Sequence, residues 1–277
     1  MQTSAVDGRD GGRRSRGSRR RQEAIRERVL AEGFVRLEEL AREFNISTMT
    51  VHRDLDELQR QGWLRKIRGG ATSRPSALYH GDVRYRLQAE TEAKQELARS
   101  ALPLVGDAQV LMLDDSTTVL HLARLLPSVG PLTVVTNFLA IINALAGEAG
   151  IDLMAIGGVY YPAYDAFLGI QAVEAIRPLR ADIAFLSTTA IVDGACYHQS
   201  HETVQVKRAL MAAAKVKVLL VDHTKFGRRA LHRLESLASF DHVIVDSRTA
   251  SSDVEALSRL GVRVVVAKPE EHARAER

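Results

Sequence analysis

The chain has 277 residues, enough for roughly two domains, and its 45% hydrophobic and 5% aromatic content is typical of an aliphatic-rich α/β protein. Its single cysteine cannot form an internal disulfide, and no apolar run approaches the roughly 18 residues of a membrane span, so disulfide-rich and membrane-spanning classes are excluded. The net charge of +4 is concentrated in residues 1–21, which contain seven Arg and two Asp. We therefore expect a cytoplasmic protein whose N-terminal end binds a polyanion.

Residues 1–18 are rich in Gly, Arg and Ser, a composition that predicts a disordered basic tail. The arginines resemble the start of an export signal, but no apolar stretch follows them, so export is not expected. The next segment places Ile25 and Val29 on one face, which predicts a helix over 19–32 that ends at Gly33.

Residues 34–72 predict two short helices, a polar turn and a basic hairpin. Leu37, Leu40 and Phe44 recur at helical spacing, and a second periodic run begins after Ser47, which is a natural N-cap. The second helix would present polar side chains on its first turns, as the recognition helix of a helix-turn-helix does. The residues that we expect to contact DNA are Ser47, Thr48, Thr50, His52 and Arg53 on this helix, and Lys66 and Arg68 in the hairpin.

An ordinary helical hairpin with a solvated charged face is the alternative for this segment, but the order of its parts favours DNA binding. The run VHRDLDELQRQGWLRKIRGGAT, residues 51–72, resembles the end of the winged helix-turn-helix in the DeoR family of bacterial sugar-operon regulators. His52 stands where that family usually has Arg. The resemblance implies a winged DNA-binding domain over 19–72, and the composition of the following residues predicts a linker over 73–84.

A helix is expected over about 85–105, and after it short apolar runs alternate with helical segments. Continuous apolar runs of this length indicate a doubly wound α/β domain over 85–270, with a mostly parallel sheet covered on both faces. Ligands of such domains gather at the carboxyl ends of the strands. The predicted strands are 110–114, 132–137, 152–158, 181–188, 217–222, 242–246 and 262–267.

Polar residues follow several of these strands in a way that suits a phosphorylated ligand. Hydroxyls and free amides at a helix start can hold phosphate, glycines let the backbone approach a ligand, and lysines supply countercharge. Each feature alone is more often a helix cap, a turn or a solvated lysine, so the signal is their order along the strands. The expected effector-binding residues are Asp114, Ser116, Thr117, Thr118, Thr136, Asn137, Gly157, Gly158, Lys207 and Lys225.

This order resembles the effector domain of DeoR regulators, which shares its fold with ribose-5-phosphate isomerase and glucosamine-6-phosphate deaminase. The family usually shows Asp-Ser-Gly-Thr-Thr at the first loop, whereas residues 114–118 have Ser116 in place of Gly. The resemblance implies a sugar-phosphate effector on which no chemistry is done, and neither a cofactor nor a metal is expected.

Two other functions remain open from the residues alone. A sugar-phosphate isomerase or deaminase with a DNA-binding head would need a base, and Asp114, Asp115, Asp193 and Glu202 are the available carboxylates. An architectural DNA binder would not respond to a ligand. We expect a regulator, acting as a repressor, of a carbohydrate operon. Because one winged domain makes few contacts with double-stranded operator DNA, we expect a homo-oligomer, either a dimer or a tetramer.

Overall fold

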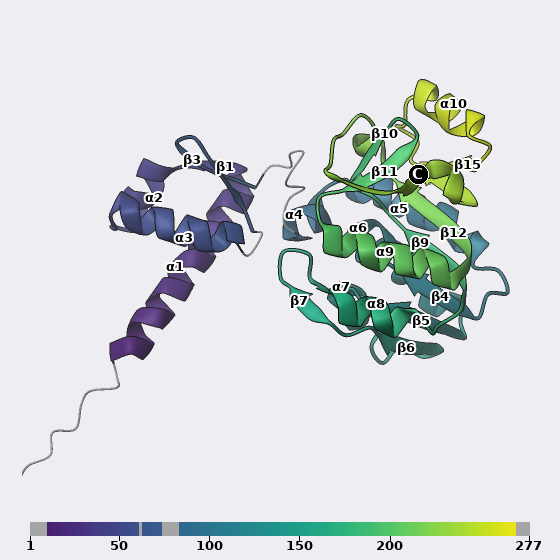
Figure 1. Cartoon of the computed structure of the whole chain (residues 1–277), viewed down its shortest axis with the longest axis horizontal. Coiled ribbons are helices and arrows are strands. Elements are labelled where there is room, and N and C mark those ends of the chain that lie inside the picture. The colour runs from purple at the N-terminus through teal and green to yellow at the C-terminus, as the bar shows by residue number, and fades with distance from the viewer. Residues whose placement is uncertain (1–9, 61–62, 74–82, 270–277) are drawn as a thin grey trace, which may run out of the picture. The chain divides into compact units, whose positions relative to one another are not determined.

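The computed structural model describes residues 10–60, 63–73 and 83–269, which form two compact units divided between Pro75 and Ser76 (Figure 1). The first unit contains three helices and a three-stranded antiparallel sheet in the order β1-β3-β2. Its elements are α1 (Asp10–Glu32), β1 (Phe34–Arg36), α2 (Leu37–Glu43), α3 (Thr48–Arg60), β2 (Arg65–Ile67) and β3 (Gly70–Thr72).

The predicted helix-turn-helix and wing are both present in this unit. The apolar faces of the three helices meet in one core, in which Ile25, Leu40 and Leu55 have no solvent exposure. A partly buried ion pair also joins α1 to α3, because Arg21 Nε donates to Asp54 Oδ2 at 2.6 Å. Burial of these residues fixes which face of α3 stays available to a ligand.

The predicted disorder of residues 1–18 is wrong for residues 10–18, because α1 begins at Asp10; residues 1–9 lie outside the described part of the chain. Arginine is a good helix former, and the run of arginines continues the helix that is anchored by Ile25 and Val29. The prediction gave more weight to the glycines and the charge than to this propensity.

The second unit is built on a seven-stranded parallel sheet, as predicted, in the order β15-β14-β12-β9-β4-β5-β6. The strand order reverses between β4 and β9, the first and the fourth strands of this sheet in the sequence. The strands are β4 (Val110–Leu113), β5 (Leu132–Thr136), β6 (Ile151–Ala155), β9 (Ala181–Leu186), β12 (Ala214–Val221), β14 (His242–Val245) and β15 (Arg263–Val266).

Helices cover this sheet in two sets that pack among themselves. α6 contacts α5 and α7, whereas α9 contacts α8, β9 and β12. Right-handed crossovers on either side of the reversal place the two sets on opposite faces. The helices are α4 (Val83–Gln88), α5 (Thr91–Ala101), α6 (Thr117–Ala123), α7 (Leu139–Leu145), α8 (Ile170–Ile176), α9 (His201–Ala213) and α10 (Ser251–Arg259), with single 3-10 turns at Leu102–Leu104, Leu126–Ser128, His223–Lys225 and Leu237–Ser239.

Smaller strands that the sequence analysis did not predict lie beside the main sheet. β7 (Val159–Tyr161) and β8 (Ala166–Leu168) form a hairpin, and an antiparallel sheet of three short strands has the order β10-β11-β13. Its strands are β10 (Ala190–Val192), β11 (Ala195–His198) and β13 (His232–Ser236). No helix within the described ranges is both long and apolar enough to cross a membrane.

The predicted linker and the long helix after it differ from the structure. Ser73 belongs to the first unit, where its buried hydroxyl donates to the Val29 carbonyl at 2.9 Å, and α4 already begins at Val83. Residues 74–82 lie outside the described part. The single helix over 85–105 is instead α4, α5 and a 3-10 turn, because Glu90 adopts a left-handed conformation with φ of 53°.

Candidate DNA-binding face and effector site

The first turns of α3 form an exposed polar face, as predicted. Thr48 and Arg53 are exposed and His52 is half-buried, while Val51 on the opposite side of the helix lies in the core. Met49, which the sequence analysis did not single out, is 62% exposed beside them. These side chains can reach base edges if α3 enters a major groove.

Ser47 and Thr50 serve first to begin α3. The Ser47 hydroxyl accepts a hydrogen bond from the Thr50 amide at 3.2 Å, and the two hydroxyl oxygens lie 2.9 Å apart. Capping of this kind satisfies an amide that the helix itself cannot pair. The cap therefore explains both residues locally, although Ser47 remains exposed.

The two basic residues of the wing have different surroundings. Lys66 on β2 forms an ion pair with Asp56 of α3, and its amide donates to Gln59 Oε1 at 2.7 Å, so this lysine joins the wing to the helix. Arg68 is exposed in the turn between β2 and β3, followed by Gly69 with φ of 81°. Of the two residues, Arg68 is the better placed to meet phosphates.

Asp114 and Lys207 meet at the point where the strand order of the large sheet reverses. Asp114 follows β4, and its Oδ2 accepts from the Ser187 amide at the end of β9 at 2.7 Å. Lys207 projects from α9 and pairs with Asp114 and, at 3.1 Å, with Asp115 Oδ1. All three side chains are at most 3% exposed. This position is where ligands bind in doubly wound sheets.

Two carboxylates share the ammonium group of Lys207. Burial opposes the charge of Lys207, but Asp114 and Asp115 outweigh it and raise its pKa. Burial raises the pKa of Asp114 in spite of the ammonium group. For Asp115 burial acts in the same direction, but Lys207, His198 and Arg86 together outweigh it, and the pKa is lowered. Lys207 is therefore a charged ammonium group between two carboxyl groups, and burial makes the anionic form of one of them, Asp114, less favourable.

The hydroxyls of the first loop are partly engaged with the protein. The Ser116 hydroxyl caps α6 by accepting from the Val119 amide at 3.1 Å, and the Ser116 amide donates to Asp114 Oδ1 at 3.0 Å. Thr117 Oγ1 donates to the Arg86 carbonyl at 3.3 Å. Thr118 is buried in the same first turn of α6. The loop is therefore ordered around Asp114 rather than open to solvent.

Thr136 is the last residue of β5 and Asn137 follows it, and both are fully buried. The Thr136 hydroxyl accepts from the Phe138 amide at 3.2 Å, and Asn137 Nδ2 donates to the Phe167 carbonyl of β8 at 3.0 Å. The amide oxygen of Asn137 has no hydrogen-bond partner although it is buried. A buried acceptor of this kind is a position at which a ligand donor would be favourable.

The glycine pair after β6 has two different roles. A Cβ atom at Gly158 would lie 2.7 Å from the Leu168 carbonyl oxygen and 3.2 Å from Ala172 Cβ, so this glycine is required by packing within the protein. The expectation that Gly158 leaves room for a ligand is therefore wrong. A Cβ atom at Gly157 would meet nothing within 4 Å, so that space is open.

Lys225 does not join Lys207 in a shared cationic pair. Its Nζ lies 3.0 Å from Asp222 Oδ2 at the end of β12, and Asp222 is fully buried. The positive charge of Lys225 is therefore balanced locally by Asp222. The sequence analysis expected both lysines to supply countercharge to an anion; in the structure each of them is already paired with carboxylates of the protein.

Two groups near Lys207 were not anticipated as site residues. His198 accepts through Nδ1 from the Ser200 amide at 3.1 Å; burial and then the charge of Lys207 lower its pKa to about 3, so the ring is neutral. Thr203, one helical turn before Lys207 on α9, has a fully buried hydroxyl without a hydrogen-bond partner. The one signal in the sequence that could have suggested Thr203 is its spacing of four residues from Lys207, which places both on the same face of a helix.

Asp193 and Glu202, the other two carboxylates considered for catalysis, lie in separate local environments. Asp193 adopts φ of 48° in the turn between β10 and β11, and Glu202 Oε2 accepts from the Ser200 hydroxyl at 3.1 Å. Cys196 on β11 is fully buried, and burial raises the pKa of its thiol to about 12, which makes it unreactive.

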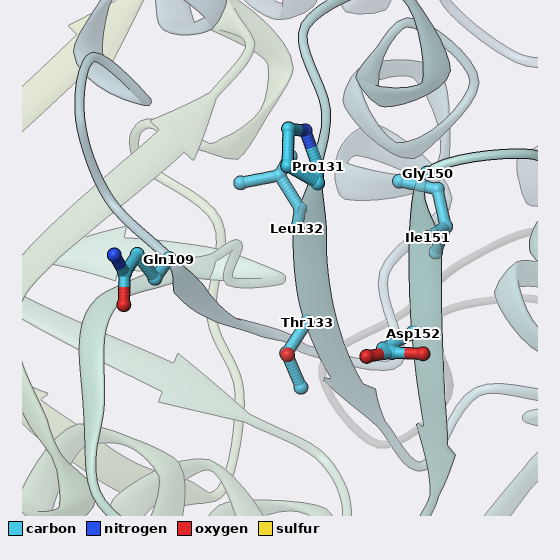
Figure 2. Close-up of a pocket in the computed structure, with 7 residues that line it drawn as sticks. All are labelled: Gln109, Pro131, Leu132, Thr133, Gly150, Ile151 and Asp152. Atoms are coloured by element: carbon cyan, nitrogen blue, oxygen red, sulfur yellow. The ribbon is translucent and has the colours of Figure 1, made fainter.

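A cavity of about 340 Å³ opens at the amino ends of β4, β5 and β6, the opposite end of these strands from Asp114 (Figure 2). None of the predicted effector residues lines it. Asp152, Thr133 and Gln109 contribute its polar side chains, as Figure 2 shows. This cavity is a rival position for a small ligand. The residues that line it are Gln109, Pro131, Leu132, Thr133, Gly150, Ile151 and Asp152.

Comparison with known proteins identifies both units. Residues 21–77 match the DeoR-like helix-turn-helix domain, and residues 89–247 match the DeoR C terminal sensor domain. The chain belongs to the DeoR family. This DeoR-family protein is therefore a DNA-binding transcriptional regulator, whose second unit is a sensor domain.

Curated relatives of this DeoR-family chain are regulators of sugar operons. It is 32% identical to the L-fucose operon activator of Haemophilus influenzae, over 82% of this chain and 91% of the relative. It is 30% identical to the glycerol-3-phosphate regulon repressor of Escherichia coli, over 86% and 94%. It is also 30% identical to the lactose phosphotransferase system repressor of Staphylococcus epidermidis, over 82% and 91%.

Solved structures with some likeness to the chain include ribose 5-phosphate isomerase A from Methanocaldococcus jannaschii, at a TM-score of 0.35 and 17% identity over 48% of this chain and 53% of that one. Translation initiation factor eIF-2B from Pyrococcus horikoshii has a TM-score of 0.39 and 15% identity over 83% and 88%. Similarity at this level supports no conclusion about function.

Proposed function

We propose that this regulator represses a carbohydrate operon and that a phosphorylated sugar, bound around Asp114 and Lys207, changes its affinity for operator DNA. The DNA contacts come from Thr48, His52 and Arg53 on α3 and from Arg68 on the wing. Its relatives act as transcription regulators, which supports a sensor that binds the sugar phosphate without converting it. The sensor unit would also join copies of the chain into a dimer or tetramer in the cytoplasm.

The observation that carries the effector site is a pair of buried polar atoms without partners, one after the carboxyl end of β5 and one a helical turn before Lys207 on α9. The Thr203 hydroxyl and the Asn137 amide oxygen are buried and have no hydrogen-bond partner. Leaving such groups unpaired costs about 1–3 kcal/mol each. A polyhydroxylated ligand would satisfy them, so the site is better suited to a sugar than to an apolar molecule.

Thermal unfolding of the full chain with ribose 5-phosphate, fructose 6-phosphate, glucosamine 6-phosphate and inorganic phosphate tests this proposal. A ligand at 100 times its Kd should stabilise the protein by about 2.7 kcal/mol. Stabilisation by no sugar phosphate would contradict the proposed sensing function. Turnover of the ligand at ordinary enzymatic rates would instead favour an isomerase or deaminase.

The variant Thr203→Val should show whether the ligand binds at this site or in the cavity of Figure 2. The substitution removes an unpaired buried hydroxyl without changing its shape, so the ligand-free protein should be as stable as before or more stable. The Kd for the stabilising sugar phosphate should rise about tenfold if that hydroxyl binds it. Thr133→Val, in the cavity of Figure 2, is the matched control. An effect of Thr133→Val alone would move the ligand to that cavity.

Arg53→Ala should weaken binding to duplexes that the full-length protein has selected from a random-sequence pool. The exposed guanidinium can make a bidentate contact with guanine, so the loss should be about 1–3 kcal/mol and sequence discrimination should fall. Arg60→Ala, at the far end of α3, is the control. Binding would be measured at one fixed salt concentration. Retained discrimination in Arg53→Ala would show that Arg53 contacts the backbone or no DNA at all.

A further inference from the structure

An anionic effector near Lys207 would need a cation that the predicted lysines do not provide. Lys207 is shared by two buried carboxylates, and Lys225 is paired with Asp222. His198 is neutral at physiological pH, since burial and Lys207 lower its pKa to about 3. Moving a phosphate into this environment without further countercharge would be strongly unfavourable.

Arg86 on α4 is a candidate for that cation, because its charge acts on Asp115 and His198. Its carbonyl accepts from Thr117 Oγ1 at 3.3 Å, and the amide of Val83 donates to the Ala163 carbonyl at 3.1 Å, so α4 lies against the loop after β4 and the turn between β7 and β8. The charge of Arg86 acts on the same groups as that of Lys207. After burial and Lys207, it contributes to the lowered pKa of His198, and it adds to the effect of Lys207 on Asp115.

α4 is attached by the apolar side chains of Val83 and Leu87, which pack in the core of the second unit, and by a few polar contacts. Lys94, itself buried, donates to the Arg86 carbonyl and, at 2.5 Å, to the Ala89 carbonyl. The next residue, Glu90, has φ of 53° and pairs with Arg248 at 2.6 Å. A six-residue helix with a left-handed residue just beyond it can shift as a unit when its contacts change.

We propose that Arg86 binds the phosphate of the effector and that the resulting shift of α4 changes the affinity of the protein for DNA. This inference rests on the proposed function. It adds the residue that recognises the anion and the element that carries the response. An arginine can bind a phosphate with two parallel hydrogen bonds, and α4 is the first described helix of the second unit. A ligand shifts such an equilibrium only through contacts that differ between the two states.

The test uses full-length Arg86→Met and Arg86→Lys, with Arg84→Met as the control from an exposed position on the same helix. The probe is whichever sugar phosphate of the panel stabilises the wild type. Arg86→Met should raise its Kd at least about tenfold, the loss of a charged hydrogen bond, and Arg86→Lys should raise it less. Without the probe, all three variants should bind the selected duplexes as the wild type does. Circular dichroism would confirm that they are folded.

The outcomes separate the two proposals. A wild type that responds to no sugar phosphate contradicts the proposed function itself. A wild type that responds, together with an Arg86→Met variant of unchanged Kd, overturns the role of Arg86 alone. If Arg86→Met binds weakly but a saturating probe still alters DNA affinity as in the wild type, Arg86 binds the anion and the coupling through α4 is overturned. Loss of both binding and response in Arg86→Met, with Arg84→Met unaffected, supports the whole proposal.

Discussion

Replacement of Lys207 by methionine is expected to destabilise the sensor unit by about 3–5 kcal/mol, because it leaves two buried carboxylates without their shared cation. Asp114 has no solvent exposure and Asp115 only 3%, so water cannot replace the ammonium group. The remaining donors to Asp114 are the amides of Ser116 and Ser187. At least one of the two acids should then become protonated at neutral pH.

Urea unfolding of Lys207→Met should be followed with two signals. Far-UV circular dichroism includes the sensor unit, while the fluorescence of Trp63, the single tryptophan, reports the first unit. We expect the circular-dichroism transition to move to lower urea and the Trp63 transition to stay in place. Lys217→Met is the matched control, since Lys217 is partly exposed and 3.8 Å from Asp241, a pair worth roughly 0–1 kcal/mol.

The double variant Lys207→Met with Asp114→Asn should recover part of the loss, since it removes one of the unpaired carboxylates. A loss below about 1 kcal/mol in Lys207→Met would mean that the acids are already neutral, and the charge arrangement described for this site would be wrong.

Gly70→Ala is expected to destabilise the DNA-binding unit by roughly 1–3 kcal/mol or more and to weaken binding to every duplex. An added Cβ would lie 2.2 Å from the Val35 carbonyl oxygen and 2.8 Å from the ring of Phe34. The nearest atom belongs to the backbone of β1, which pairs with β3 at Arg36 and Gly70, so relief requires the wing to separate from β1. A unit of this size has roughly 3–9 kcal/mol of total stability, so the loss is a large part of it.

Urea unfolding followed by Trp63 fluorescence would measure the loss of stability in Gly70→Ala. Gly17→Ala is the control, because it should raise the stability of the same unit. Gly17 is exposed within α1, and a Cβ there meets nothing within 4 Å. Alanine at this position should stabilise the helix by about 0.5–1 kcal/mol. Equal stability of Gly70→Ala and the wild type would show that β1 and the wing can move apart freely, contrary to the packing of this unit.

The parallel sheet could be predicted because each of its strands is a short apolar run, a pattern set by burial on both faces. The hairpin of β7 and β8 could not, since three-residue strands leave almost no periodic signal. The break between α4 and α5 was also invisible in the sequence. It contains neither Gly nor Pro, and the left-handed Glu90 is held by Arg248, a residue far away in the chain.

For the candidate site, the sequence analysis assigned Asp114 and Lys207 to one effector site, and the fold brings these two residues into contact although 93 positions separate them. The sequence could not show how their charges are balanced, because pairing depends on distances that only the fold sets. The sequence therefore predicted that Lys207 binds an anion, whereas in the structure its charge is balanced by Asp114 and Asp115. His198, in a short strand, and Arg86, in a short helix, carried no pattern that marked them.

The burial of Cys196 makes the native chain suitable for attaching a dye at one chosen place. Its thiol is inaccessible and has a pKa of about 12, so a maleimide should react with an introduced surface cysteine and leave Cys196 untouched. With Arg84→Cys carrying an acceptor on α4, Trp63 becomes a built-in donor in the other unit. A single substitution would thus allow energy transfer between Trp63 and the acceptor to report how the DNA-binding unit moves relative to the sensor unit when the effector binds.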